Sequence, residues 1–366
     1  MKKLKSLVSH VRAASEFRSV PLQFSDILLH KLVINLAPSD YYRFEFYRND
    51  MGWQEKSRYV AFDGSVYWPF ENNEFKYAST LTNKYIQKHL LIGFGIPTPR
   101  LITTLGDDME LHSKEQFIDF LDKMDRHVVI KPVNGAGGTD VRIVTKIEGG
   151  VQSGNKTYTQ TGLWDQLMAS SCKRFLIEDR VSNTGVLARL NPNCLNTFRA
   201  VTIKTNDGRW HCAAISVKIG ADGAMVDNNA DGGIQINLDT NGKPVNAYDF
   251  AAKASITHHK RTGIELMGLE FEGYRDVLEL ALSASQKFNF LGTIGWDIAF
   301  TEGGPMIIEG NIVWGCSSLQ RGRPGIITDE LARGLTKHRV FGRWDKSCLY
   351  PGYDKKPLWR RRWSTR

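Results

Sequence analysis

The feature that most constrains this fold is a short glycine-rich segment between two stretches of β-branched residues. Residues 127–131 (His-Val-Val-Ile-Lys) and 141–144 (Val-Arg-Ile-Val) are both typical of strands. Nine residues, 132–140, separate them, whereas a parallel connection needs about a dozen or more, usually as a helix. We therefore expect an antiparallel hairpin closed by a glycine-rich loop, with Lys131 at the end of its first strand.

Other hairpins follow along the chain. Residues 197–204 and 210–218 flank the turn Asn206-Asp207-Gly208, and residues 293–300 and 305–309 flank Glu302-Gly303-Gly304. Periodicity and capping residues predict the remaining elements, which are helices over 83–94, 162–171 and 274–290 and a strand over 174–178. Because no strand–helix–strand series indicates a doubly wound core, we predict an α+β fold dominated by antiparallel sheets.

Charge and cysteine usage limit the class of protein. The formal net charge is +9, but residues 1–20 hold five basic groups against one acid, and residues 355–366 hold six basic groups and no acid. The rest of the chain is therefore at −1, whereas a nucleic-acid enzyme spreads positive charge over its working surface. We expect no nucleic-acid partner. Five scattered cysteines without a Cys-x-x-Cys pair indicate a reduced, cytoplasmic chain with no zinc site.

The last hairpin places two carboxylates opposite each other. If Thr301 faces Pro305, counting back pairs Asp297 with Glu309, and Asn311 shares their face. Opposed like charges are destabilising unless they are compensated, and Mg²⁺ prefers oxygen ligands of this kind. The pattern predicts a metal site, and removal of either charge should then preserve or raise the stability of the metal-free chain. The alternative is that both acids point to solvent at a sheet edge.

Two further segments carry weaker signals. The loop from Gly135 to Thr139 could bring backbone N–H groups close to phosphate oxygens beside Lys131, although it matches neither the P-loop nor the dinucleotide pattern and could be a plain turn. Residues 176–181 (Leu-Ile-Glu-Asp-Arg-Val) place acids at the end of an apolar strand. Such a segment could meet an adenine edge and a ribose, or could be a solvated strand end.

Taken in order, these elements resemble the ATP-grasp superfamily over roughly residues 30–325. The order is Lys84, then Lys131 with its glycine loop, then Glu178-Asp179, then the Asp297…Glu309-x-Asn311 set. The branch it most resembles is the sugar-transfer-associated ATP-grasp family. That likeness rests on Pro38-Ser39-Asp40-Tyr41-Tyr42, Leu190-Asn191-Pro192, Asn196-Thr197-Phe198-Arg199, Asp227-Asn228 with Gly232-Gly233, and Gly295-Trp296-Asp297.

The resemblance implies that ATP lies between two α+β lobes with two Mg²⁺ ions. The nucleotide-binding residues it implies are Lys84, Lys131, Gly135, Ala136, Gly137, Gly138, Thr139, Glu178, Asp179, Val181 and Lys218. The metal ligands it implies are Asp297, Glu309 and Asn311. Arg199 and Lys131 would act on the γ-phosphate and the acyl phosphate, and the substrate residues would be Arg199, Asn196, Asp227, Asn228 and Gly233. The domains expected are a helical and aromatic extension (1–82), a small lobe (83–182), a large lobe (183–345) and a basic tail (346–366).

Two departures from the superfamily pattern concern the acceptor pocket. Many of its ligases place an arginine two residues before the first metal aspartate, where this chain has Gly295, so Arg199 would take over that task. The Pro-Gly that usually follows the metal asparagine is replaced here by residues 313–316 (Val-Trp-Gly-Cys). We interpret Cys316 as structural, since no neighbouring base would activate its thiolate.

The function that the resemblance implies is an ATP-dependent carboxylate–amine ligase. It would join an amino acid or amine to a uronic-acid-type carboxylate of a glycan or glycan precursor in surface polysaccharide biosynthesis. A phosphotransferase acting on a hydroxyl, and a non-catalytic nucleotide-binding scaffold at a membrane, are the alternatives. The two basic ends also carry apolar side chains, among them Leu4, Leu7 and the tryptophans on either side of residues 360–362. This pattern predicts a peripheral contact with the inner face of an anionic membrane. The alternative is that both ends are solvated tails.

Overall fold

The structure is a computed structural model. It describes residues 8, 10–34, 36–48, 50–56, 58–60, 73–135, 137–224, 226–228, 231–322 and 324–334. Ala136, most of the basic segment before residue 10 and the basic tail over 346–366 lie outside the described residues, so the predictions made for them stay predictions. The domain boundaries expected at residues 82, 182 and 345 also stay predictions.

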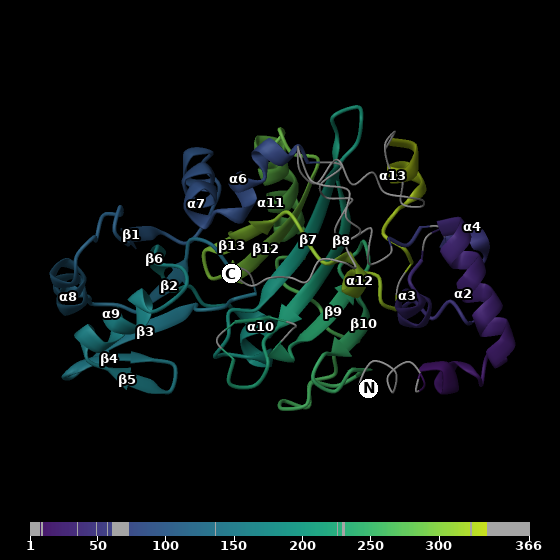
Figure 1. Ribbon diagram of the computed structural model, residues 1–366, viewed down its shortest axis with the longest axis horizontal. Coiled ribbons are helices and arrows are strands. Elements are labelled where there is room, and N and C mark those ends of the chain that lie inside the picture. Colours follow the sequence, from purple (N-terminus) through teal and green to yellow (C-terminus); the bar gives the residue numbers. More distant parts are fainter. Residues whose placement is uncertain are drawn as a thin grey trace.

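Two antiparallel sheets form the body of the molecule (Figure 1). The smaller sheet has six strands in the order β1-β6-β2-β3-β4-β5. Its strands are β1 (Leu101–Leu105), β2 (Val128–Pro132), β3 (Arg142–Ile147), β4 (Gly150–Ser153), β5 (Lys156–Tyr158) and β6 (Phe175–Asp179). Helices α8 (Lys114–Lys123) and α9 (Gln160–Met168) pack on it through an apolar core that includes Phe117, Leu163 and Ile177. We call this unit the small lobe.

The larger sheet has seven strands in the order β11-β10-β9-β8-β7-β12-β13. Its strands are β7 (Thr197–Lys204), β8 (Trp210–Ile219), β9 (Ile234–Leu238), β10 (Pro244–Asp249), β11 (Ala254–Ser255), β12 (Thr293–Thr301) and β13 (Gly304–Asn311). We call this sheet, with α10 (Gly185–Leu190) and α11 (Tyr274–Lys287), the large lobe. Every strand pair in both sheets is antiparallel over the described residues, which confirms the predicted α+β class.

The two faces of the larger sheet differ in chemistry because side chains alternate along each strand. One face is apolar and packs on α11 through a core that includes Phe198, Ala200, Val217, Trp296, Val277 and Ala281. The residues that alternate with them along the strands form the other face, which is polar. They are Thr197, Arg199, Ser216, Lys218 and Asp297. Burial of the apolar face therefore turns a row of charged side chains toward the space between the lobes.

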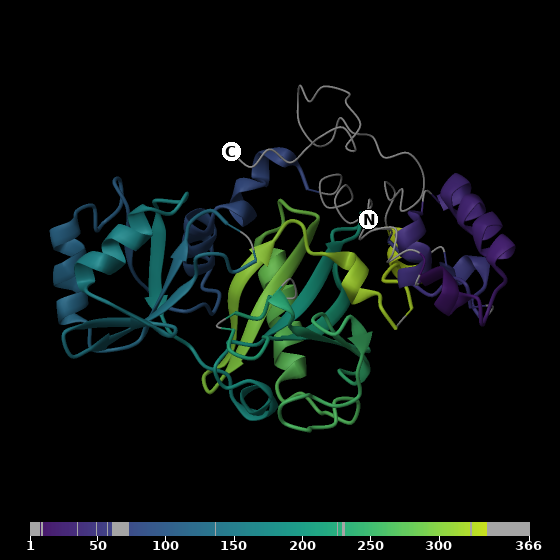
Figure 2. The same ribbon diagram turned by 60° about the horizontal axis from the view of Figure 1, so that its bottom comes forward.

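Helices connect the lobes and extend the large lobe on its far side. Between the lobes lie η1 (Phe75–Tyr77), α6 (Ser79–Thr82) and α7 (Lys84–Gly93). At the opposite end lie α2 (Val20–Ile34), α3 (Pro38–Arg43), α4 (Trp53–Lys56) and α13 (Asp329–Gly334), as Figures 1 and 2 show. Helix α12 (Cys316–Leu319) packs beside β8 of the larger sheet. No described helix is both long enough and apolar enough to cross a membrane.

The predicted hairpins are confirmed. Val128 pairs with Val144 across the glycine-rich loop, and Thr197 pairs with Lys218 in the next hairpin. The cap predicted for the helix at 83 is also present, since Asn83 accepts hydrogen bonds from the N–H groups of Tyr85 and Ile86. Sequence patterning therefore located the strands and the helix start to within one to three residues.

One detail of the prediction for the last hairpin was wrong. Thr301 pairs with Gly304, not with Pro305, so the connecting turn is one residue shorter than predicted. A bulge between the 297–309 and 298–307 pairs adds one residue on β13 and restores the count. Asp297 therefore does lie opposite Glu309, as predicted, with Ile308 as the extra residue.

Candidate active site

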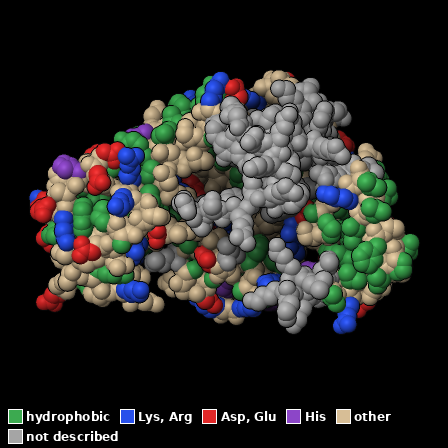
Figure 3. All heavy atoms as spheres, in the orientation of Figure 1, with side chains coloured by type: hydrophobic (Ala, Val, Ile, Leu, Met, Phe, Trp, Pro, Cys, Tyr) green, Lys and Arg blue, Asp and Glu red, His purple; other side chains and the backbone are tan. Residues whose placement is uncertain are grey.

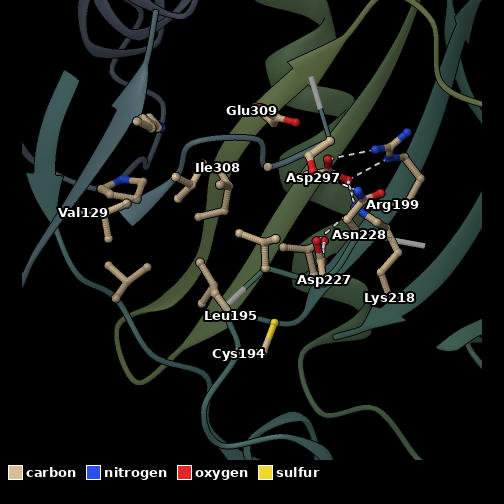
Figure 4. Close-up of a pocket in the computed structure, with 18 of the residues that line it drawn as sticks. Val129, Cys194, Leu195, Arg199, Lys218, Asp227, Asn228, Asp297, Ile308 and Glu309 are labelled. Atoms are coloured by element: carbon tan, nitrogen blue, oxygen red, sulfur yellow. Dashed lines mark hydrogen bonds and ion pairs between the residues drawn. The ribbon is translucent and has the colours of Figure 1, made fainter. Parts of the chain in front are cut away.

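A cavity of about 550 Å³ lies between the two lobes, within the range typical of small-molecule sites, roughly 300–1,000 Å³. The small lobe contributes apolar side chains such as Val129 and Ile143 to its wall, and the large lobe contributes Arg199, Lys218 and Asp297. Figure 4 shows this division, with apolar carbon on one side and charged groups on the other. The cavity thus has an apolar end and a charged end.

Three predicted metal ligands meet at the charged end. Asp297 and Glu309 are opposed on β12 and β13, and Asn311 lies two residues beyond Glu309. The Asn311 carboxamide nitrogen lies 3.2 Å from Asp297 Oδ2 and 3.4 Å from Glu309 Oε1. Both carboxylates therefore converge on one point, as the sequence predicted.

Cations of this chain compensate the carboxylates. Arg199, opposite Asp297 on β7, donates from Nε and Nη2 to its two carboxylate oxygens at 2.6 and 2.8 Å. Lys218 Nζ lies 3.1 Å from Asp227 Oδ1 and 3.5 Å from Asp297 Oδ1. Lys84 Nζ lies 3.3 Å from Glu309 Oε2. The sequence analysis took a metal ion as the compensating charge. The structure shows that β7, the strand next to the hairpin, also supplies a compensating charge through Arg199.

Burial and pairing set the charge states here. Burial would raise the pKa of Asp297, but Arg199 and Lys218 outweigh it and lower that pKa to about 2. Burial would lower the pKa of Lys218, but Asp227 and Asp297 raise it above its ordinary value. The pKa of Asp227 is raised, because burial is the largest influence on it and the Asp297 charge adds to that. Asp297 is therefore ionised at neutral pH.

The donor set fits a magnesium ion. Two carboxylates and a carboxamide carry the hard oxygen atoms that Mg²⁺ takes, and the Asn311 oxygen would join them if its carboxamide, whose nitrogen now faces both carboxylates, turned over. Over the described part of the chain, no three His, Cys, Asp or Glu side chains gather in a metal-binding group. A metal at this point would therefore need the Asn311 oxygen or the oxygens of a bound phosphate in addition to Asp297 and Glu309.

On the small lobe, Lys131 belongs to a buried ion-pair cluster that the sequence did not reveal. Its Nζ lies 2.7 Å from Glu178 Oε2, and Lys88 Nζ lies 2.9 Å from Glu178 Oε1. Lys88 also donates to Thr98 Oγ1 at 2.5 Å and to the Pro99 carbonyl at 2.9 Å. Burial lowers the pKa of Lys88 to about 8, although Glu178 partly opposes that shift.

This cluster changes the interpretation of Glu178. We expected residues 176–181 to offer a carboxylate to a ribose, but the Glu178 carboxylate is 3% exposed and is held by the two lysines. Asp179 is more accessible and pairs with Arg100 at 2.7 Å, and Val181 lines the cavity. Glu178 thus fixes the position of Lys131 in the cavity wall.

The glycine-rich loop reaches across to the large lobe. Asn228 donates to the carbonyl of Gly137 at 2.8 Å, and a Cβ on Gly138 would lie 2.7 Å from a Val226 methyl carbon. Gly137 and Gly138 also have positive φ angles of 66° and 72°, which favour glycine. On the other side, Lys84 donates to the Gly135 carbonyl at 2.8 Å. The described part of the loop therefore closes over the cavity.

Comparison with known proteins agrees with this arrangement. Residues 66–328 match the family described as sugar-transfer associated ATP-grasp. The chain belongs to that family. Its two antiparallel sheets with the cavity between them form an ATP-grasp fold. No curated protein matches the chain.

Solved structures similar to this family member are distant in sequence. An L-amino acid ligase from Bacillus licheniformis is 15% identical with a TM-score of 0.39, over 66% of this chain and 43% of that one. A D-alanine–D-alanine ligase from Bacillus anthracis is 18% identical with a TM-score of 0.35, over 64% and 58%. An N5-carboxyaminoimidazole ribonucleotide synthetase from Thermotoga maritima is 14% identical with a TM-score of 0.35, over 64% and 42%. The chain thus spans between 42% and 58% of the lengths of these proteins.

Two residues predicted for the substrate of this ATP-grasp protein lie elsewhere. Asn196 is fully buried, and its carboxamide donates to the carbonyls of Leu187 and Asn191 and accepts from the N–H of Gly220. Gly233 is also absent from the cavity wall, because it lies against the backbone of Ile219. Both residues make contacts within the fold rather than with the cavity, and the substrate role assigned to them stays a prediction.

The other predicted site residues that the structure describes line the cavity. They are Lys84, Lys131, Gly135, Gly137, Gly138, Thr139, Glu178, Asp179, Val181, Arg199, Lys218, Asp227, Asn228, Asp297, Glu309 and Asn311. The structure brings them together from both lobes, and what each does there stays a prediction. Residues outside the predicted set include Lys88, which holds Glu178, and polar side chains of the cavity wall such as Asn183, Asn191, Asn193 and Gln235.

The structure gives a physical reason for the missing arginine. A Cβ on Gly295 would lie 2.2 Å from the Cβ of Trp314, so no side chain fits there. Trp314 is buried, donates its indole N–H to Thr293 Oγ1 at 3.1 Å and accepts a hydrogen bond from Arg199 through its carbonyl. Cys316 is likewise buried, as predicted for a structural cysteine. Trp314 therefore fills this space and supports Arg199 at the same time.

Proposed function

We propose that the chain is an ATP-dependent carboxylate–amine ligase that works through an acyl phosphate. The observation that carries this proposal is the composition of one cavity. Asp297, Glu309 and Asn311 converge on one wall beside Arg199, and Lys131 with the glycine-rich loop forms the other wall. A site for the transfer of a phosphoryl group to an oxyanion needs both a place for metal ions and cations for the phosphates.

The two ends of the cavity suit the two ends of ATP. The apolar end, which includes Val129, Ile143 and Val181, suits an adenine ring. Lys131 and Lys84 would contact the phosphates under the glycine-rich loop. Magnesium held by the three ligands would neutralise phosphate charge and polarise the bond that breaks.

The chemistry follows from the need to activate a carboxylate. A carboxylate oxygen attacks the γ-phosphorus, the bond to the β-phosphate oxygen breaks, and an acyl phosphate and ADP form. The amine nitrogen then attacks the acyl carbon, loses a proton, and inorganic phosphate leaves with the electron pair of the C–O bond. Arg199 would stabilise the charge that develops on the phosphoryl and acyl oxygens, and the closed loop would exclude water that could hydrolyse the acyl phosphate.

The family description supports a sugar-linked substrate. We place the amine or amino acid and the uronic-acid-type carboxylate of a surface glycan at the large-lobe end of the cavity. There Asp227 could bind an ammonium group, while Asn228 could hydrogen-bond hydroxyl groups. The cavity-lining side chain of Gln235, beside Lys218 on the neighbouring strand, adds a second carboxamide for hydroxyl groups.

A trapping experiment tests the ligase. The chain is incubated with Mg-ATP, a panel of acidic glycans and glycan precursors, an amino-acid panel and, in a parallel series, hydroxylamine. A ligase gives ADP that depends on the carboxylate and a hydroxamate in the hydroxylamine series. A phosphorylated glycan formed without any amine would instead establish the alternative phosphotransferase. ATP binding without any product across the whole panel would favour the non-catalytic scaffold.

We also propose a cytoplasmic location with peripheral contact to an anionic membrane surface. The support is the charge distribution, because the basic residues gather in 1–20 and 355–366. Glycan precursors that carry a lipid would be presented at such a surface. Flotation with vesicles tests this proposal, and failure of the full chain to bind anionic vesicles at low salt would contradict it.

A further inference from the structure

Helix α2 is built with its polar side inward. Gln23 and His30 are 0% and 3% exposed, whereas Phe24, Leu28 and Leu32 are 60%, 60% and 75% exposed. A surface helix of a globular protein normally has the opposite arrangement, with an apolar stripe against the core. Apart from Ile27, which packs on the cluster around Tyr41, the apolar side chains described above therefore belong to a face of α2 that is turned away from the rest of the chain.

Specific contacts fix this orientation. Gln23 donates to the Arg18 carbonyl at 2.7 Å and accepts from the Tyr42 hydroxyl at 3.1 Å. Asp26 accepts from the Tyr41 hydroxyl at 3.0 Å and pairs with Arg18. His30 packs against the rings of Tyr41, Phe46 and Trp53. Rotation of α2 to bury its leucines would break all of these contacts, so its outward face is an anchored feature of the fold.

The outward face is broad and contains no acid. Its exposed apolar residues are Val20, Leu22, Phe24, Leu28, Leu29 and Leu32. At 3.6 residues per turn they span roughly 200° of the helix circumference. Asp26, the one acid of α2, is turned inward, and Lys31 is the charged residue among the exposed ones. Figure 3 shows hydrophobic side chains gathered at this end of the molecule, over α2.

We propose that this face of α2 is the surface through which the chain lies on an anionic phospholipid membrane. The inference rests on the membrane contact proposed above and names the residues that make it. An arc of about 200° is wider than the stripe of about 100° that one packed helix covers, whereas the headgroup and acyl boundary of a bilayer can surround it. A second copy of the chain is the competing occupant.

The charge distribution of the chain supports an anionic lipid surface as the partner of this face. The exposed arc offers Lys31 and no carboxylate, and the basic groups of the chain gather in 1–20, next to α2 in sequence, and in 355–366. Each lysine or arginine near such a surface adds attraction that salt screens, while the apolar contact persists at high salt. Phe24, Leu28 and Leu32 would insert, and Lys31 would stay at the headgroup level.

Flotation of the full chain with phosphatidylcholine vesicles that contain 30% phosphatidylglycerol tests the surface. We expect the wild type to bind at 50 mM NaCl and to keep part of that binding at 500 mM. The variant F24Q/L28Q/L32Q should lose at least tenfold in partition coefficient and all of the salt-resistant part. The matched control I92Q/V245Q, which removes exposed apolar side chains on other elements, should bind like the wild type.

Two further variants separate the contributions. R360E/R361E/R362E should weaken binding at 50 mM NaCl and leave the salt-resistant part in place. Lys31→Glu should weaken binding while α2 stays intact by circular dichroism, which keeps the test valid if the triple glutamine variant unfolds. Equal binding of F24Q/L28Q/L32Q and the wild type at 500 mM would overturn the α2 assignment and leave the membrane proposal standing.

Two other results would overturn the inference. No binding of the wild type to the anionic vesicles would remove both the α2 surface and the proposed membrane contact. A wild-type dimer in sedimentation velocity that F24Q/L28Q/L32Q abolishes, in a chain that ignores vesicles, would assign this face to a second copy.

Discussion

The two lobes present opposite charge to the cavity between them. On the small-lobe side, Lys131 and Lys88, the latter from the connecting helix α7, share the single carboxylate of Glu178, which leaves one positive charge in excess. The large lobe itself sets three carboxylates against Arg199 and Lys218, which leaves one negative charge in excess, and Lys84 of the connecting helix α7 contacts one of these carboxylates, Glu309. This difference predicts the orientation of a metal-bound polyphosphate. Its phosphate oxygens would lie against the small lobe and its metal ions against the large lobe.

The lobes also differ in how tightly these charges are held. Glu178 and Lys88 are about as buried as any charged side chains described here, whereas Glu309 is 26% exposed and is joined to Lys84 by a single 3.3 Å contact. Breaking a buried pair leaves an uncompensated charge and is costly, while an exposed pair contributes little. Substitutions on the two sides should therefore separate fold stability from ligand binding.

The largest effect is expected for Asp297→Asn. Turnover should fall below detection, and the unfolding free energy of the metal-free chain should drop by on the order of 3 kcal/mol, because buried Arg199 loses its carboxylate partner. The sequence argument expected unchanged or higher stability, and the Arg199 contact reverses that expectation. Chemical denaturation and an ADP-release assay measure the two quantities. Wild-type turnover in this variant would refute the metal assignment.

Lys88→Met should change the pH dependence of stability. The pKa of Lys88 is about 8 in the folded chain and ordinarily 10.5, so the unfolded chain binds more protons between these values. The stabilising contribution of Lys88 is present above pH 10.5 and is lost as the pH falls through 8. The wild type should therefore gain on the order of 3 kcal/mol relative to the variant from pH 8 to 10.5. Parallel unfolding curves across this window would contradict the buried position.

Lys131→Ala should weaken ATP binding by about 1–3 kcal/mol, the size of a lost hydrogen bond to a charged group. Glu178 keeps Lys88 as a partner in this variant, so the fold should persist. Isothermal calorimetry with Mg-ATP measures the change. Lys146→Ala, on β3 but outside the cavity wall, serves as the control and should bind like the wild type. Unchanged affinity in Lys131→Ala would remove this lysine from the phosphates.

The smallest change in stability is expected for Glu309→Gln. Its carboxylate is partly exposed and has one ion-pair contact, so the unfolding free energy should stay within about 0.5 kcal/mol. Turnover should nevertheless be lost, as in Asp297→Asn, because both carboxylates serve the same proposed ion. A variant that is fully active, or one that is as unstable as Asp297→Asn, would show that the two carboxylates do not divide these roles.

Local sequence patterns predicted the parts of the site that hairpins create. The pairing of Asp297 with Glu309 needs only the positions of two strands and a short turn, although two errors cancelled in reaching it. The predicted turn was one residue too long, and the bulge at Ile308 was not foreseen. A bulge depends on packing between strands, which alternation along one strand does not encode.

Contacts between distant segments could not be predicted in the same way. Arg199 reaches Asp297 across 98 positions because β7 inserts next to β12, an order that strand patterns do not specify. Lys88 did leave a signal, since it lies one helical turn after Lys84 and three residues before buried Leu91. The burial of Asn196 was also beyond the sequence pattern, because its carboxamide bonds to the backbone carbonyls of Leu187 and Asn191, which are brought to it by the fold of the preceding segment.

The contact between Gly295 and Trp314 also limits how this site could change during evolution. An arginine at position 295 would collide with the Cβ of Trp314, so that substitution alone would disrupt the sheet. Truncation of the tryptophan to alanine would open a cavity in the core at a cost of roughly 3–5 kcal/mol, and it would still leave the Cβ of residue 314 in the way. Mutational paths toward the arginine-bearing arrangement therefore pass through unstable intermediates, which would preserve the substrate role that we propose for Arg199 on the neighbouring strand.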